Sequence, residues 1–292
     1  MILAKNGWNL FYANDQFEIE GFGISEDGFI TVLSDKNNYI IKLFDENNLF
    51  VKKKEIEKSS RLYLGVPRLF GVGEKFVFGP TEKKYYNFDL ESKKIKKNRY
   101  PFKSWGTPFY LPDAYYLSRS FNLGSVSIYN ENLQKQSHFL VDYFKKASDT
   151  LYKANFKTDI LKINPSIPFI QFEVINKESY DYILLDNING KLLAFSGQEI
   201  VDCIILEKLG LEASSIFGTS FSCELIKDSF TDQLYMRYDK NLYVIDTNIL
   251  EIKIIDSSQY YSSFIEIYKN KVYAIFQIEE LNTSGIYYKT ID

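Results

Sequence analysis

The sequence predicts an all-β fold made of repeated antiparallel sheets, and three observations support that prediction. Aromatic residues make up 17% of the 292 residues, and such side chains suit the half-buried surface of a pleated sheet. Short apolar runs alternate with turn-forming residues, and only Glu199 to Ala213 shows a helical pattern of apolar positions. A faint repeat returns after about forty residues, the length of a compact four-stranded unit.

The first landmark of the repeat is a polar turn followed by an apolar run. Turn-forming residues placed between strand-forming runs are typical of β-hairpins. The landmark occurs at Glu26-Asp27-Gly28, Gly73-Glu74-Lys75, Pro112-Asp113, Ser148-Asp149, Thr231-Asp232 and Lys269-Asn270-Lys271, with a weaker copy at Lys177-Glu178-Ser179.

The second landmark is an alternating apolar strand that ends in Asp or Asn and leads through a turn into a polar strand. Both residue types tolerate turn geometry and can bond their own backbone. Such strands end at Asp45, Asp89, Asn130, Asp186, Asp246 and Asp292. The last copy stops one strand short of a full unit. We therefore expect Met1 to Ala4 or Trp8 to Ala13 to supply the missing strand and close the array into a ring.

Across nearly the whole chain this pattern resembles β-propeller repeats. Neither the Trp-Asp dipeptide nor the Gly-Gly pair of particular propeller families is present, since Asn9 follows Trp8 and Gly106 follows Trp105. The resemblance implies one β-propeller domain over residues 1–292, with an irregular insertion, a loop or a helix, around 154–215. Spacing favours seven four-stranded blades and leaves six open. A β-sandwich or a jelly-roll pair is the competing architecture.

The sequence offers few residues for catalysis or metal binding. His138 is the only histidine, so a Ser-His-Asp triad must use it. Cys203 and Cys223 are too few for a zinc site or a disulfide framework, and we expect two buried free thiols. The prediction is therefore a protein without cofactor, metal or enzyme activity. One alternative is a glycoside hydrolase or lyase that uses two of the 38 acidic residues, and another is a small-ligand or sugar binder.

The segment from Met1 to Asn9 lacks the features of a signal peptide, and the longest apolar runs are far shorter than a membrane span. The net charge is −3, so no general basic field attracts nucleic acid. These features predict a cytoplasmic protein that binds neither membranes nor nucleic acid.

Positive charge is concentrated in one part of the chain. Residues 52–103 hold 15 Lys and Arg against 6 Asp and Glu, whereas residues 199–292 hold 8 against 15. Lysines on exposed edge strands protect a sheet from pairing with other chains, and they can also dock an acidic protein. The candidate basic patch, on the fourth strands of neighbouring blades, consists of Lys52, Lys53, Lys54, Lys93, Lys94, Lys96 and Lys97.

The densest aromatic stretch, residues 100–116, also holds three of the seven prolines. Tyr and Trp dominate the energetics of protein interfaces, and proline stiffens a loop before binding. The stretch is therefore either a connection packed between blades or a protein-binding loop. The candidate binding residues are Tyr100, Phe102, Trp105, Phe109, Tyr110, Tyr115 and Tyr116.

Taken together, these features favour a non-catalytic scaffold that binds a protein partner. Its most concrete form is a bacterial immunity protein, which would neutralise a toxin in the cytoplasm. The absence of a catalytic set and a composition rich in Lys, Asn, Ile and Tyr, typical of an AT-rich genome, agree with this form. An architecture by itself does not determine function.

Overall fold

In the computed structural model the described residues are 7–58, 68–72, 75–81, 84–99, 108–111, 115–120, 125–129, 135–140, 170–174, 180–187, 190–196, 199–211, 223–228, 230–262, 265–278 and 283–291. Most of them lie in β-strands joined by tight turns. Within these ranges the helices are two short 3-10 turns, η3 (Leu206–Leu209) and η5 (Gln259–Ser262).

The strands of the described residues form six four-stranded antiparallel sheets. The first holds β2 (Glu18–Ser25), β3 (Gly28–Ser34), β4 (Asn38–Asp45) and β5 (Phe50–Glu57). The second holds β6 (Arg68–Val72), β7 (Lys75–Thr81), β8 (Lys84–Asp89) and β9 (Lys94–Arg99). The third holds β10 (Pro108–Leu111), β11 (Tyr115–Ser120), β12 (Ser125–Tyr129) and β13 (Lys135–Leu140).

The remaining three sheets follow in chain order. The fourth holds β14 (Ile170–Val174), β15 (Tyr182–Asp186), β16 (Lys191–Ser196) and β17 (Glu199–Ile205). The fifth holds β18 (Cys223–Lys227), β19 (Leu234–Tyr238), β20 (Asn241–Asp246) and β21 (Glu251–Ser257). The sixth joins β22 (Ile265–Tyr268), β23 (Lys271–Ile278) and β24 (Thr283–Thr290) to β1 (Asn9–Asn14).

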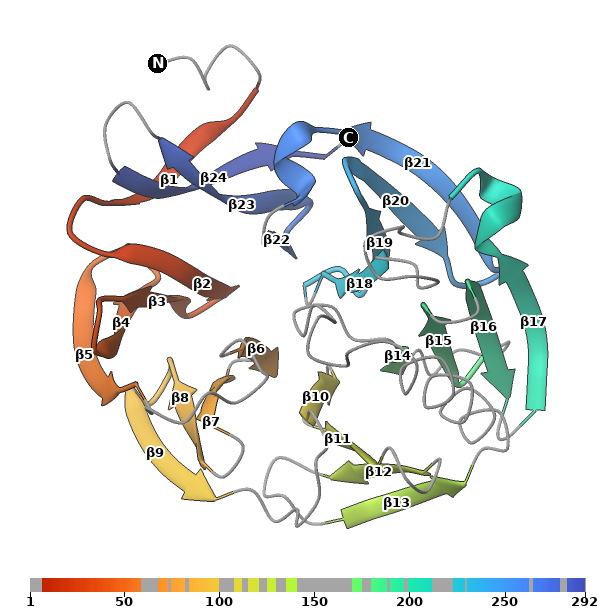
Figure 1. Cartoon of the computed structure of the whole chain (residues 1–292), viewed down its shortest axis with the longest axis horizontal. Coiled ribbons are helices and arrows are strands. Elements are labelled where there is room, and N and C mark those ends of the chain that lie inside the picture. Colours follow the sequence, from red (N-terminus) through yellow and green to blue (C-terminus); the bar gives the residue numbers. More distant parts are fainter. Residues whose placement is uncertain are drawn as a thin grey trace, which may run out of the picture.

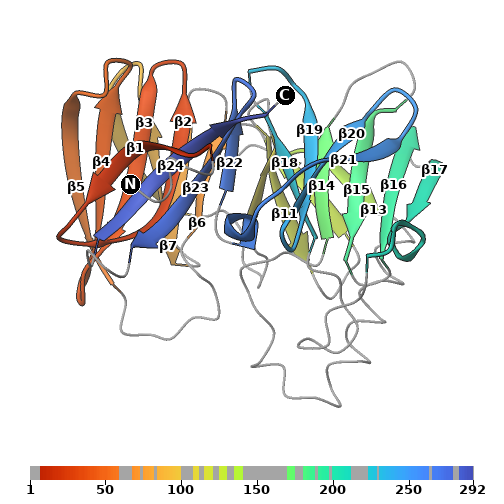
Figure 2. The same cartoon turned by 90° about the horizontal axis from the view of Figure 1, so that it is seen from above.

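The six sheets stand around a common centre (Figure 1). The innermost strands contact one another in a closed cycle, from β2 through β6, β10, β14, β18 and β22 back to β2. Neighbouring strands run in opposite directions, so that the turns gather at two opposite faces (Figure 2). The outermost strands β5, β9, β13, β17, β21 and β1 form the rim.

The ring is closed by a strand from the beginning of the chain, as the sequence predicts. β1 pairs with β24, from Asn9 opposite Tyr288 to Asn14 opposite Ser284. The closing strand is thus the second of the two candidate segments; Met1 to Ala4 lie outside the described residues. The buried Trp8 ring packs edge-on against Tyr261 and Phe276, with centroid distances of 6.1 and 5.0 Å.

The first landmark of the repeat coincides with the turns between the first and second strands of the sheets. One two-residue turn of this kind is Lys269-Asn270, between β22 and β23, where both residues have positive φ, 52° and 55°. Two positive φ values in a two-residue loop match the right-handed twist of the strands that it joins. Gly28, with φ of 136°, leaves no room for a Cβ, which would meet the Phe44 carbonyl oxygen at 2.1 Å.

The described residues depart from the sequence prediction in the number of sheets. They form six sheets, whereas spacing favours seven. The copy of the landmark at Ser148-Asp149 lies outside the described residues, and the weaker copy at Lys177-Glu178-Ser179 precedes β15. One interval between successive copies of the landmark is therefore longer than the usual length of the repeat.

The predicted insertion around 154–215 is wrong for residues 170–205, because β14 to β17 form the fourth sheet there. The predicted helix at Glu199 to Ala213 is wrong as well. Glu199–Ile205 is the outermost strand of that sheet, and only the following turn, Leu206–Leu209, is helical. Ile200 and Val201 are exposed, so the apolar residues at helical spacing do not form the buried face of a helix.

The hydrophobic core consists of seams between adjacent sheets. One seam joins the fourth and fifth sheets, one the fifth and sixth, one the sixth and first, and one the first and second. In the seam between the first and second sheets, the backbone at Gly23 lies close to the Phe76 ring. A Cβ on Gly23 would lie 2.1 Å from that ring, so the position requires glycine. Large aromatic side chains fill wedge-shaped seams of this kind, which explains the aromatic content of the sequence.

Candidate binding rim and inner carboxylates

Seven exposed lysines stand at the outer edge of the first and second sheets. Three lie on β5, three lie on β9, and one occupies the turn before β9 with φ of 56°. This set is called the basic rim and consists of Lys52, Lys53, Lys54, Lys93, Lys94, Lys96 and Lys97. Its members come from the two strands on which the sequence predicts a contiguous patch.

The two halves of the basic rim touch. Lys52 Nζ donates a 3.2 Å hydrogen bond to the backbone carbonyl of Lys93, across the junction of the two sheets. Lys53 Nζ lies 2.5 Å from a carboxylate oxygen of Glu55, an exposed pair on the same strand. Ammonium groups gathered in this way raise the local positive potential and attract an acidic surface.

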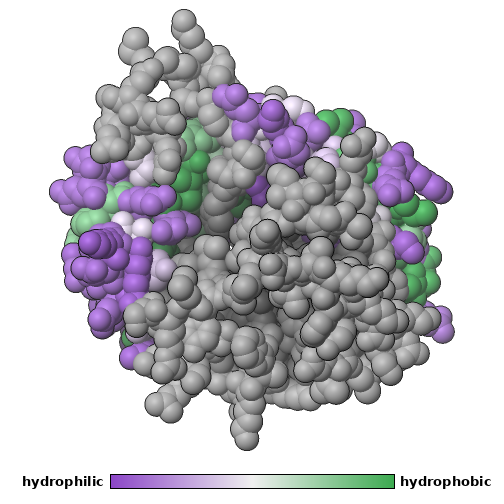
Figure 3. Space-filling model, in the orientation of Figure 1, coloured by the Kyte–Doolittle hydropathy of each residue, from purple (hydrophilic) through white to green (hydrophobic). Residues whose placement is uncertain are grey.

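The other outer strands have a different character. β17 carries no lysine, β13 has Lys135 alone, and β21 has Lys253 alone. Apolar side chains are exposed there, with Ile200 and Val201 on β17 and Ile254 on β21, and β5 exposes Phe50 at its first position as well. Hydrophilic residues gather over β5, and hydrophobic residues mark the edge near β17 (Figure 3).

The predicted aromatic binding residues divide into two groups. Tyr100, Phe102 and Trp105 lie outside the described residues. The other four lie in paired strands rather than in a loop: Phe109 and Tyr110 on β10, and Tyr115 and Tyr116 on β11. In that hairpin Tyr110 stands opposite Tyr116, and β10 is the innermost strand of the third sheet.

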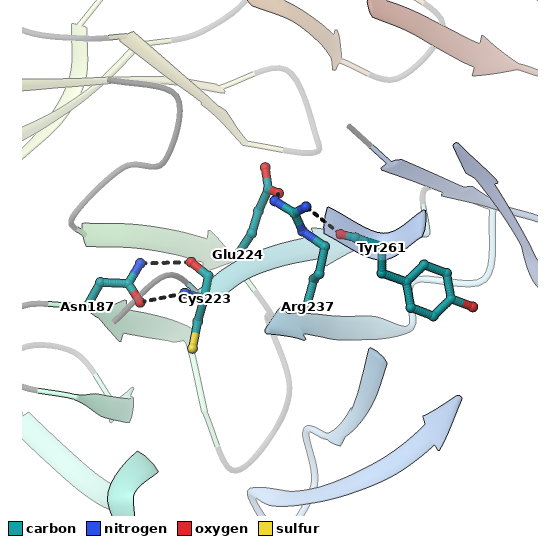
Figure 4. Close-up of polar contacts among 5 residues, drawn as sticks. All are labelled: Asn187, Cys223, Glu224, Arg237 and Tyr261. Carbon is teal, nitrogen blue, oxygen red and sulfur yellow. Dashed lines mark hydrogen bonds and ion pairs between the residues drawn. The ribbon is translucent and has the colours of Figure 1, made fainter. Parts of the chain in front are cut away.

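A buried ion pair lies at the inner edge of the fifth sheet. Arg237 on β19 faces Glu224 on the innermost strand β18, and Arg237 Nη2 lies 2.6 Å from Glu224 Oε2 (Figure 4). Nη1 donates a 2.6 Å hydrogen bond to the backbone carbonyl of Tyr261 in η5. The Arg237 side chain is 10% exposed and that of Glu224 29%. The guanidinium therefore fixes the Glu224 carboxylate and compensates its charge.

Glu266 occupies the innermost strand of the next sheet, β22. Tyr273 lies directly opposite it on β23, so the two side chains share a face of the sheet. Tyr273 packs with Tyr268 and with Phe22 of β2 in the seam between the sixth and first sheets. Burial raises the pKa of the Glu266 carboxyl to about 8, and the negative charge of Glu224 adds to the effect. The residue nonetheless keeps some solvent contact.

An amide links the fourth sheet to the fifth beside the Arg237 ion pair. Asn187 Nδ2 donates to the Cys223 carbonyl at 2.8 Å, and the Cys223 N–H donates to Asn187 Oδ1 at 3.2 Å (Figure 4). Burial raises the pKa of the Cys223 thiol to about 12, so this thiol is unreactive. The expectation of two buried thiols holds for Cys223 and is wrong for Cys203, which is exposed on β17.

The remaining candidates for chemistry lie far from the centre or are absent from the described ranges. His138 is on β13, the outermost strand of the third sheet, opposite Ser127. Among the described residues no group of three His, Cys, Asp or Glu side chains could hold a metal ion. No helix in the same ranges is long and apolar enough to cross a membrane.

Comparison with known proteins bears on the fold. The sequence matches no protein-family model and no curated protein. It is similar in structure to a streptogramin B lyase, with 11% identity over 96% of this chain and 87% of that chain, and a TM-score of 0.52. The fold is a β-propeller.

A second solved structure is similar to this propeller. It is a catalytically inactive histidine-to-alanine variant of virginiamycin B lyase from Staphylococcus aureus with quinupristin. The identity is 10%, the match covers 96% of this chain and 99% of that one, and the TM-score is 0.50. At such identities both similarities establish the blade architecture and leave the activity open.

Sequence reasoning missed the inner carboxylates, Glu224 and Glu266. A signal for them was present, because the string Glu-Leu-Ile-Lys at residues 224–227 recurs as Glu-Ile-Tyr-Lys at residues 266–269, one repeat later. Each glutamate is the second residue of its innermost strand and stands between two apolar residues. Only the ring brings the two strands together.

Proposed function

We propose that this propeller is a non-catalytic binding module that docks an acidic protein surface on its basic rim. The observation that supports the proposal is the concentration of seven exposed lysines on two neighbouring outer strands, β5 and β9, and on the turn before β9, which Lys52 reaches. A positive patch of this kind steers an acidic partner during encounter and fixes its orientation.

The distribution of lysine argues for docking over edge protection alone. Every open sheet edge needs protection against pairing with another chain. The lysines are nevertheless concentrated on β5 and β9, whereas β17 has none and exposes Ile200 and Val201. Edge protection does not explain that asymmetry, but a partner-binding surface on one side of the ring does.

The test compares binding partners of three forms of the full chain. One is the wild type, one carries Lys52→Gln, Lys53→Gln and Lys54→Gln, and the matched control carries the same change at three exposed lysines elsewhere. Proteins retained from a lysate of the native host are quantified by mass spectrometry. The control lysines are Lys208, Lys240 and Lys253.

We expect at least one acidic protein whose recovery falls about tenfold or more with the rim variant and stays unchanged with the control, because both variants lose the same charge. Its complex with the wild type should dissociate as salt is raised, since exposed charges are screened beyond about 8 Å at physiological ionic strength. If every retained protein bound the rim variant and the control equally, the docking proposal would be wrong.

In its most concrete form, the proposal is an immunity protein that neutralises a bacterial toxin in the cytoplasm. Its support remains the lack of a catalytic set in the sequence and the single histidine. In this form the captured acidic protein is a toxin encoded beside this chain, and co-expression must rescue cells from it. Growth arrest that persists despite co-expression would remove this form and leave the docking proposal intact.

The alternative of a carboxylate-dependent glycoside hydrolase or lyase has weaker support. Its best candidate pair is Glu224 and Glu266, but Arg237 already compensates the charge of Glu224, which makes that carboxylate a poor base. The similar lyase structure is of a variant inactivated at a histidine, whereas His138 of this chain lies on an outermost strand. We therefore favour binding over catalysis.

A further inference from the structure

The inner carboxylates differ in one respect that matters for binding. Glu224 has a partner for its charge, because the Arg237 guanidinium lies 2.6 Å away. Within the described part of the chain no hydrogen bond or ion pair reaches the Glu266 carboxyl, which interacts electrostatically with Glu224 alone. A carboxyl group that is partly shielded from water and without a partner has a raised cost of ionisation, which protonation or a bound cation removes.

The surroundings of Glu266 are aromatic. Tyr273 stands directly opposite on β23, Tyr268 follows two residues later on the same face, and both pack with Phe22 of β2. Ile265 and Ile267 point the other way, into the seam with the fifth sheet. The carboxyl therefore stands on the face of β22 that carries these rings, where β22 meets β2, and Glu224 of the adjoining strand β18 lies within electrostatic reach.

We propose that Glu266 is the anionic element of a binding site for one organic cation, an alkylammonium or guanidinium group, at the junction of the innermost strands β18, β22 and β2. The site is independent of the basic rim, which lies at the outer edge of the first and second sheets.

The charges select a monovalent cation. Arg237 pairs with Glu224, so the three side chains together carry a net charge of −1 when Glu266 is ionised, although the Glu224 carboxylate is still close enough to Glu266 to repel its negative charge. Divalent metals take several oxygen ligands at once, and no group of three such residues exists in the described ranges. Aromatic rings beside a carboxylate attract ammonium and guanidinium groups through both the charge and the ring faces. An organic cation fits these features better than a metal ion does.

Binding at this site releases a proton. At neutral pH the Glu266 carboxyl carries a proton, since burial and the Glu224 charge raise its pKa to about 8. The groups that face it are Glu224 from β18, Tyr273 from β23 and Phe22 from β2, and Arg237 is engaged by Glu224. An incoming ammonium group replaces the proton, which passes to the buffer. The carboxylate and the cation then form an ion pair.

Isothermal titration calorimetry on the full chain tests the site, with n-butylammonium chloride and guanidinium chloride as probes. Titrations in two buffers of different ionisation enthalpy count the protons released, and we expect about one per cation bound at pH 7. Binding should be about tenfold tighter at pH 8.0 than at pH 6.5, because the carboxylate population rises in that range.

A matched pair of variants assigns the site. Glu266→Gln keeps the shape of the protonated carboxyl, so we expect it to fold and to lose cation binding at least tenfold. Glu251→Gln makes the same change at an exposed position on β21 and should bind like the wild type. Circular dichroism of both variants verifies the fold, and the infrared band of a protonated carboxyl at pH 7 should vanish only in Glu266→Gln.

The probes also distinguish two sources of the cation. Tight binding of butylammonium indicates a free amine as ligand, whereas tighter binding of a short lysine-containing peptide indicates a side chain inserted by a partner. Either result supports the site if Glu266→Gln abolishes the binding of that probe. Equal binding by the wild type and Glu266→Gln, proton-independent binding, or no heat with any probe at millimolar concentration would overturn the proposal.

Discussion

Two half-buried acidic residues show how the neighbours of a side chain decide its charge. Burial alone would raise the pKa of Asp256, but the Lys289 ammonium, 2.8 and 3.0 Å from its two oxygens, and the Tyr261 hydroxyl donate to the carboxylate and lower it. Glu266 is also half-buried but has no cation in contact, so desolvation, with the like charge of Glu224, raises its pKa. A cation in contact with a carboxyl group therefore lowers its pKa by more than desolvation raises it. Where no cation is in contact, desolvation dominates and the pKa rises.

The raised pKa of Glu266 predicts a loss of stability as the pH rises. The folded state holds this proton up to pH about 8, whereas an unfolded glutamate releases it near pH about 4.3. Between these values the folded state binds more protons, so the free energy of unfolding falls with pH, by at most about 1.4 kcal/mol per unit. Urea denaturation between pH 5 and 9 measures this slope.

Glu266→Gln removes the titrating group and provides the comparison. We expect it to match the wild type at pH 5 and to exceed its stability by about 2–3 kcal/mol at pH 8.5, after allowance for the partial solvent contact of the residue. Asp256 titrates in a separate acidic window, since its lowered pKa gives stability that is lost only as the pH falls below about 4. Parallel curves for the two proteins from pH 5 to 9 would contradict the assignment.

At the scale of elements, one carboxylate ties the turns of two neighbouring blades. Asp228, at the end of β18, accepts hydrogen bonds from the Phe230 and Thr231 N–H groups within its own turn. It also accepts from the Lys269 and Asn270 N–H groups of the β22–β23 turn, at 3.2 and 3.0 Å. Asp228 is fully buried, so its carboxylate depends on these donors for its hydrogen bonds.

Asp228→Ala should therefore lower the free energy of unfolding by about 2–4 kcal/mol, because four backbone N–H groups in two turns lose a charged acceptor at once. Asp246→Ala is the control, since the Asp246 carboxylate is exposed and accepts from Asn248 within a single turn. Its expected cost is about 0.5–1 kcal/mol. Equal urea midpoints for the two variants would show that the tie between blades contributes nothing.

The hairpins were the part of the structure most accessible to sequence reasoning. A polar turn between two strand-forming runs is a local signal, and it located the first turn in every described sheet. The helix predicted at Glu199–Ile205 was wrong because the signal there is not local. The environment of an outermost strand is set by the rest of the ring. An exposed edge strand with apolar residues at helical spacing cannot be recognised from that spacing alone.

At the scale of the whole molecule, the two ends of the chain meet in one sheet. β1 completes the sixth blade through β24, and Trp8 buries its ring between Tyr261 and Phe276. Ring closure supplies the fourth strand of the last blade. It also joins segments that are separated by most of the sequence. Stability of the ring should therefore depend on the first fourteen residues.

Trp8→Ala should cost about 3–5 kcal/mol, the range for removing a large buried aromatic side chain, and deletion of residues 1–14 should cost more. Leu10→Ala on the same strand is the control, because Leu10 is 55% exposed and should change stability by less than about 0.5 kcal/mol. Thermal unfolding of the three proteins distinguishes them. An unchanged melting temperature after the deletion would mean that β1 is not a structural part of the ring.

The candidate sites were predictable to different degrees. The basic rim follows from the sequence, because lysine runs at equivalent positions of adjacent repeats fall on neighbouring outer strands. The pairing of Glu224 with Arg237 and the isolation of Glu266 did not follow, since their partners come from other strands and from another blade.

The sequence by itself determined the strands, the hairpin turns, the repeated sheet and the need for a closing strand, because each depends on neighbours within a few residues of the chain. The ring decided which edge strands touch, which glutamate meets an arginine and which is left among aromatic rings. Those properties depend on contacts between residues tens of positions apart, and burial gives such contacts their energetic weight.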